Sequence, residues 1–139
     1  MITRDFLLAG RAVFTVSTPA RHYTFRVTAK EASGKYPPAW FVSLLTGPDN
    51  EHSYRYLGML DVETGHVRLT NGSRQGNFSE DSEPVRVVRI VTAVVYGVGM
   101  LPDGWTVANA GKCGRCGRAL TTPESIARGL GPECVKKGR

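Results

Sequence analysis

The sequence predicts an α+β fold, in which a small antiparallel sheet or half-open barrel with one packed helix is followed by a C-terminal module. Three observations predict this fold. Short segments rich in β-branched and aromatic residues alternate with Gly- and Pro-containing turns up to residue 70. One valine-rich segment near residues 84–99 is long enough for a helix, and all three cysteines lie after residue 112. We therefore expect a mainly antiparallel β body at residues 1–108 and a separate module at residues 109–139.

The strands of the body are predicted from alternating apolar and polar side chains and from β-propensity. The first two form a hairpin around a turn at residues 17–20. The predicted strands cover residues 12–16, 23–27, 40–46, 54–60 and 67–70, with a short final strand at 105–107. Residues 71–83 contain Gly, Ser, Asn and acidic residues with few apolar side chains, and we expect them to form a loop.

Residues 84–99 are compatible with two structures. Their many valines favour a strand by propensity. The same apolar side chains also fall on one stripe of a helical wheel, with the arginines elsewhere. Ser82 is a suitable N-cap, and Pro84 suits the first helical turn. Because the segment is long for a strand, we predict a helix that ends before Gly97.

The composition is that of a soluble globular protein, with 41% hydrophobic and 22% charged residues in a chain of 139. The longest apolar stretch, residues 90–101, is shorter than the roughly 20 residues that a membrane-spanning helix needs. Residues 1–16 lack the pattern of a signal peptide. We therefore expect no membrane association and a cytoplasmic location.

The three cysteines have the spacing of metal ligands. Cys113 and Cys116 form a Cys-x₂-Cys pair in which a glycine follows each cysteine, as in the tight turn of a zinc knuckle. Cys134 follows Pro132 in the predicted first turn of a final helix, where the helix dipole stabilises a thiolate. We predict one structural Zn²⁺ ion held by Cys113, Cys116 and Cys134. A redox-active pair and unligated thiols are the alternatives, but a redox pair normally belongs to a βαβ unit, and none is predicted.

The fourth zinc ligand is not identified by the sequence. Structural zinc is almost always four-coordinate, whereas a position left to water would allow catalysis at the metal. The residues considered for the fourth position are His22, His52, His66, Asp103, Asn109 and Glu133.

The stretch CGRCGRALTTPESIARGLGPEC at residues 113–134 resembles the cysteine module of DUF6011, a domain of unknown function found in uncharacterised bacteriophage and prophage proteins. The shared pattern is CxxCGRxL, a Pro-Glu-Ser-Ile helix start, and Gly-x-Gly-Pro-x-Cys. The resemblance implies a metal module and a phage origin, hence the cytoplasm of a bacterial host, but no assigned activity. It also implies a histidine four residues before the first cysteine, a position that Asn109 occupies here.

Positive charge is concentrated in the C-terminal segment. The chain has a net charge of +6, and residues 111–139 contain seven basic and two acidic residues. Such asymmetry indicates a polyanionic partner, although a solvated surface would have the same composition. The candidate nucleic-acid contacts are Lys112, Arg115, Arg118, Arg128, Lys136 and Lys137.

Aromatic residues in the predicted strands suggest a second possible contact surface. On an exposed sheet face they would stack on single-stranded bases, whereas on the inner face they would fill the core. These residues are Tyr23, Phe25, Trp40, Phe41, Tyr54 and Tyr56. Asp49, Glu51 and His52 form a polar cluster that we interpret as an ordinary turn.

Three functional hypotheses follow from these patterns. The leading one is a phage-type accessory protein that binds nucleic acid through a basic zinc module. The second is a non-enzymatic factor that binds and inhibits a host bacterial protein, such as a component of a defence system. The third is a metal-dependent enzyme, which the absence of a catalytic motif disfavours; we expect no enzymatic activity and no small-molecule substrate.

Overall fold

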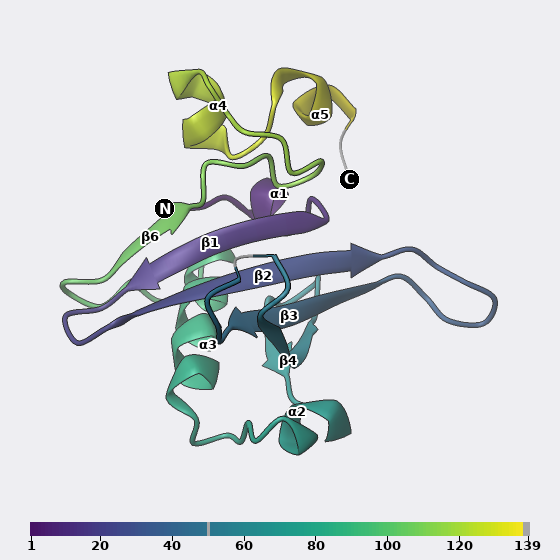
Figure 1. Cartoon of the computed structure of the whole chain (residues 1–139), viewed down its shortest axis with the longest axis vertical. Coiled ribbons are helices and arrows are strands. Elements are labelled where there is room, and N and C mark those ends of the chain that lie inside the picture. The colour runs from purple at the N-terminus through teal and green to yellow at the C-terminus, as the bar shows by residue number, and fades with distance from the viewer. Residues whose placement is uncertain (50, 138–139) are drawn as a thin grey trace.

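The computed structural model describes residues 1–49 and 51–137. Its centre is a curled six-stranded antiparallel sheet with the strand order β5-β4-β3-β2-β1-β6 (Figure 1). The strands are β1 (Arg11–Ser17), β2 (His22–Lys30), β3 (Ala39–Leu45), β4 (Tyr54–Leu60), β5 (Val67–Arg68) and β6 (Thr106–Asn109). The predicted α+β class, with a half-barrel sheet and a C-terminal cysteine module, is therefore confirmed.

The core lies between the inner face of the sheet and α3 (Glu83–Val95), which lies behind the strands in Figure 1. Phe14 and Phe25 are fully buried on this face, and their ring centroids lie 5.8 Å apart. From α3, Val85, Val88 and Val91 are fully buried at intervals close to one helical turn. The segment that was compatible with a strand or a helix is a helix because its valines form one buried stripe.

Two short helices fall where the sequence did not predict them. In α1 (Arg4–Leu7) the amide of Phe6 donates to Thr3 Oγ1 at 3.1 Å, which caps the helix. In α2 (Asn71–Gln75) the amide of Thr70 donates to Ser73 Oγ at 2.9 Å. The prediction that residues 71–83 form a loop is therefore wrong for the first five of them. A short helix leaves backbone amides at its start without partners, and here the Ser73 hydroxyl accepts the amide of Thr70 at that end.

The opposite face of the sheet carries polar and aromatic side chains. Val13, Arg26, Ser43 and Tyr56 are register partners that form a row across β1, β2, β3 and β4. Phe41 is partly exposed on this outer face, and its ring centroid lies 6.1 Å from that of Tyr56. These residues alternate along each strand with those of the core.

The six aromatic residues thus divide between the two faces. Phe25 is buried in the core, and Tyr23 and Trp40 pack against it. Phe41, Tyr54 and Tyr56 belong to the outer face by alternation with the buried positions. The guanidinium of Arg26 lies 4.0 Å from the centroid of the Tyr54 ring. Of the six aromatic residues, only Phe41, Tyr54 and Tyr56 therefore lie on the face where stacking on bases is sterically possible.

The cysteine module follows β6 and lies beside α1, on the side of the sheet where β1 and β6 lie (Figure 1). Its helices are α4 (Pro123–Arg128) and α5 (Pro132–Lys137). The predicted division between residues 108 and 109 falls within β6, which is hydrogen-bonded to β1. Residues 138 and 139 of the predicted module lie outside the described part. Within the described residues, none of the helices has the length and apolarity needed to cross a membrane.

Candidate metal centre

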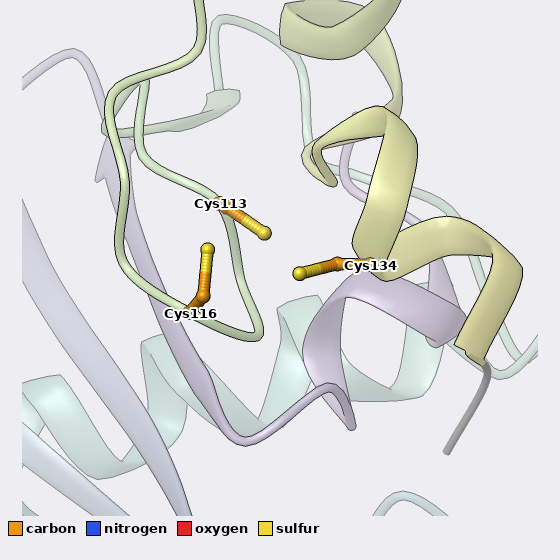
Figure 2. Close-up of side chains that lie close together, drawn as sticks. All are labelled: Cys113, Cys116 and Cys134. Carbon is orange, nitrogen blue, oxygen red and sulfur yellow. The ribbon is translucent and has the colours of Figure 1, made fainter.

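The side chains of Cys113, Cys116 and Cys134 converge on one point, as Figure 2 shows. Their three sulfur atoms all lie within 4.8 Å of one another. Thiolates bound to a tetrahedral zinc ion, at bond lengths of about 2.3 Å, are separated by about 3.8 Å. All three cysteines are free thiols. A small shift of the side chains would therefore bring the three sulfurs to the separation that a metal ion requires.

The loop between β6 and α4 brings Cys116 back toward Cys113. The amide of Gly117 donates to the Cys113 carbonyl at 2.9 Å, and the amide of Cys113 donates to the Arg118 carbonyl at 2.7 Å. Gly117 has a φ of 80°, a left-handed conformation that a glycine adopts without strain. These bonds close the turn that the Cys-x₂-Cys-Gly spacing predicted.

The third sulfur comes from α5 through a second turn. Gly129 ends α4 with a φ of 77°, and Pro132 begins α5, so that Cys134 lies in its first turn. Between the two helices, the amide of Gly131 donates to Cys113 Sγ at 3.3 Å. The turn therefore positions one cysteine and also places a donor against the sulfur of another.

The surroundings of the cluster shift the pKa values of Cys113 and Cys134 in opposite directions. Burial opposes ionisation of Cys113, but the amides of Cys116, Gly131 and Arg115 together with the Cys116 side chain stabilise its thiolate, so that its pKa is lowered to about 7. The pKa of Cys134 is raised by burial and by the proximity of the Cys116 and Cys113 sulfurs. The proximity of the sulfurs thus disfavours a second thiolate beside Cys113, and a bound cation would remove this penalty. The donor set fits a thiolate-binding metal ion such as zinc.

The module is held against α1 by close packing. Phe6 is 1% exposed, and it packs on Gly114 and Gly129, where any added Cβ would lie within 2.6 Å of its ring. The amide of Gly114 donates to the Gly129 carbonyl at 2.8 Å. Cys113 also shares a small apolar cluster with Ala9 and Leu130. The cysteine module is thus anchored to the body by Phe6 and Ala9, both from the N-terminal segment.

Within the described part of the chain, no histidine, aspartate or glutamate joins the three sulfurs. This finding applies to each of the titratable candidates for the fourth position, namely His22, His52, His66, Asp103 and Glu133. Asn109 uses both polar atoms of its side chain locally: Nδ2 donates to the Ile126 carbonyl at 2.7 Å, and Oδ1 accepts from the Gly111 amide at 2.8 Å. The cluster therefore offers three candidate metal ligands among these residues.

The basic residues of the module fall into two groups. The side chains of Lys112, Arg115, Arg118 and Lys136 form no hydrogen bond or ion pair within the described residues, and Lys112, Arg118 and Lys136 are exposed. Arg128 instead donates to the Leu130 carbonyl at 3.1 Å and to Ser125 Oγ at 3.3 Å, so it helps to fold the α4–α5 turn. The side chain of Lys137 lies outside the described part of the structure.

Sequence reasoning missed the residues that support the centre from outside the module. Phe6 provides the packing surface, and Arg11 Nη1 donates to the Cys116 carbonyl at 3.2 Å. Both precede the cysteines by about a hundred positions, and no local pattern in the sequence connects them. The sequence gives only a weak indication of the bond from the Gly131 amide to Cys113 Sγ. Glycines around cysteines are typical of zinc-binding loops that direct backbone amides at sulfur, but they do not identify which amide does so.

The fold and the cysteine cluster define a small α+β protein with a C-terminal module whose three cysteines could bind a metal ion. Residues 107–138 match the model of a family described as a family of unknown function, DUF6011. No curated protein and no solved structure matches the chain. The family match covers most of β6 and the module up to residue 138, and most of the sheet lies outside it.

Proposed function

We propose that this is a phage-type accessory protein that binds nucleic acid through the basic surface of a structural zinc module. The observation that carries the proposal is a set of four basic side chains that have no hydrogen bond or ion pair among the described residues, namely Lys112, Arg115, Arg118 and Lys136. Cations that are free of intramolecular pairs, on a loop and a helix that a metal ion would join, are suited to contact phosphates. The host cytoplasm, which holds both DNA and RNA, is the location that the resemblance to phage proteins supports.

The proposed metal is one Zn²⁺ ion with a structural role. It would join the Cys113–Cys116 loop to α5 and thereby hold Arg115 and Lys136 on one rigid unit. A segment of about thirty residues is too small to bury a sufficient core by itself, so a metal cross-link is the expected source of its stability. The proposal gives the ion no catalytic step and the protein no enzymatic activity.

The test is a fluorescence anisotropy titration of the zinc-loaded chain with labelled single-stranded DNA, single-stranded RNA and duplex DNA across a range of salt concentrations. Binding should weaken steeply with salt because phosphate contacts release counterions. The double variant Arg115→Gln/Arg118→Gln should bind more weakly and lower the slope of log K against log salt by about 0.7 per lost contact on a single strand. The control Arg86→Gln removes one arginine charge from the exposed surface of α3, and its effect is compared with that of each single variant, Arg115→Gln and Arg118→Gln. Salt-insensitive binding, or no binding to any of the three, would refute the proposal.

A second candidate is supported by two exposed apolar residues in the turn after α3. Val98 is 62% exposed and Met100 is 87% exposed. Such side chains suit a contact with a protein, which for a phage-type factor would be a host bacterial protein that it inhibits. A stoichiometric complex that forms after nuclease treatment and is lost in Val98→Ser/Met100→Ser would favour this function. No stoichiometric partner, or one that the double variant retains, would count against it.

A further inference from the structure

A pocket of about 420 Å³ lies on the outer face of the sheet, next to the metal centre. Its floor is formed by β1 and β2, one wall by the loop between β3 and β4, and another wall by the cysteine loop. The charged and polar lining residues include Arg11, Arg26, Thr28, Glu51, His52 and Lys112. Three separate parts of the chain therefore meet around one cavity.

The lining has an excess of positive charge. Arg11, Arg26 and Lys112 carry three cations, whereas Glu51 is the one carboxylate among the lining residues. The imidazole of His52 pairs with Asp49, with Nδ1 lying 3.0 Å from Oδ2. A cavity with two guanidinium groups and an ammonium group at its walls attracts an anion.

Arg26 is held in place before any ligand binds. Its Nη1 donates to the Glu51 carbonyl at 3.1 Å, and its guanidinium lies 4.0 Å from the centroid of the Tyr54 ring. Its Nε is shielded from solvent and has no hydrogen-bond partner among the described residues. Buried donors without partners are uncommon in folded proteins. The shielded Nε is not itself open to a ligand, but a guanidinium that is held in place at a cavity wall is suited to bind an oxyanion.

We propose that this pocket binds a phosphate ester, in which the anionic oxygens are bound by Arg11, Arg26 and Lys112. The inference rests on the proposed function and extends it, because Lys112 belongs both to the basic surface of the module and to the pocket. A nucleic-acid strand that crosses the module would thus place one phosphodiester in the cavity. A free nucleotide presents the same chemical group.

The metal centre and the pocket share a wall. Lys112 and Gly117 flank the loop that carries Cys113 and Cys116, and Arg11 Nη1 donates to the Cys116 carbonyl at 3.2 Å. The position of these wall residues therefore depends on the cross-link between the loop and α5. Removal of the metal should weaken phosphate binding even though no phosphate contacts the metal.

The test uses the zinc-loaded full chain, with AMP as the first probe and a 12-nucleotide single-stranded DNA as the second. In isothermal titration calorimetry, Arg26→Gln and Lys112→Gln should each weaken AMP binding by about tenfold. Arg86→Gln, on the face opposite the pocket, is the charge-matched control and should not change it. Circular dichroism checks that the variants are folded. Lys112→Gln is a safeguard because that side chain is exposed and has no hydrogen bond or ion pair among the described residues.

The outcomes separate this inference from the proposed function. The pocket assignment is overturned if AMP does not bind, or if it binds equally to Arg26→Gln, Lys112→Gln and Arg86→Gln. In that case, salt-dependent binding of the oligonucleotide would still support the proposed function. If AMP binding is lost in the pocket variants and the oligonucleotide does not bind, the pocket stands with a free nucleotide as its ligand and the proposed function fails. If both probes lose affinity in the pocket variants and after chelation of the metal, both proposals are supported.

Discussion

Replacing Gly129 with alanine tests whether the cysteine module depends on its packing against α1. Gly129 has a φ of 77°, and an added Cβ would lie 2.4 Å from Phe6 Cδ1. The left-handed conformation costs an alanine about 1–2 kcal/mol. Forcing a methyl group against a buried ring typically adds about 1–3 kcal/mol. We therefore expect Gly129→Ala to lower the free energy of unfolding by about 2–5 kcal/mol.

Gly111→Ala is the matched control for this prediction. Gly111 has a φ of 75°, but an added Cβ would meet no atom within 4 Å. Its replacement should cost only the conformational part, about 1–2 kcal/mol. Urea unfolding of both zinc-loaded variants, followed by circular dichroism, gives the difference that isolates the contact with Phe6. Equal destabilisation by the two substitutions would refute the reasoning. It would also be refuted if Gly129→Ala lowered the free energy of unfolding by the same amount in a Phe6→Leu background, where the ring is absent.

Two further predictions concern a surface ion pair and the ligand set. The hydrogen bond from Arg89 lowers the pKa of Glu80 in the folded protein. The ionised carboxylate of Glu80 therefore stabilises the fold at every pH above the pKa that Glu80 has in the unfolded chain. This contribution is lost as the pH falls through the lower pKa of the folded state. Glu80→Gln should therefore be less stable than the wild type in urea unfolding at pH 7 and equally stable in acid; a deficit that persists unchanged in acid would contradict this. Cys134→Ser should weaken cobalt binding and remove about a third of the thiolate-to-cobalt absorption, with the exposed Thr121→Ala as a control outside the sulfur cluster. An unchanged spectrum would exclude Cys134 from the ligand set.

The elements with strong local patterns were predictable. Alternation in residues 23–27 identified part of β2, and the single stripe of valines identified α3. In the module, Thr122 and Pro123 marked the start of α4, and Thr122 Oγ1 accepts from the Ser125 amide as an N-cap does. Each of these signals depends on neighbours within a few positions along the chain. Local physical chemistry therefore accounts for much of the sheet and for the convergence of Cys113 and Cys116.

The pocket and the support of the metal centre were not predictable in this way. The pocket forms because Arg11 and Arg26 point to the same outer face of neighbouring strands and because the loop with Lys112 docks over them. That docking depends on the fit of Phe6 against Gly114 and Gly129, far apart in sequence. A contact of this kind depends on side-chain shape in three dimensions, for which a single sequence carries no periodic signal. The short helices α1 and α2 were missed because one or two side-chain caps are enough to form a single turn.

Asn109 shows how a position expected to bind the metal has a different role in this chain. Its side chain links the end of β6 to the Ile126 carbonyl in α4 and also accepts the Gly111 amide in the turn that leads to Cys113. A carboxamide makes both contacts at once because its donor and its acceptor project from one planar group. Asn109 therefore positions the first cysteine through the backbone. The rigidity of the cysteine loop, and with it the location of Lys112 beside the pocket, depends on these hydrogen bonds as well as on the three sulfurs.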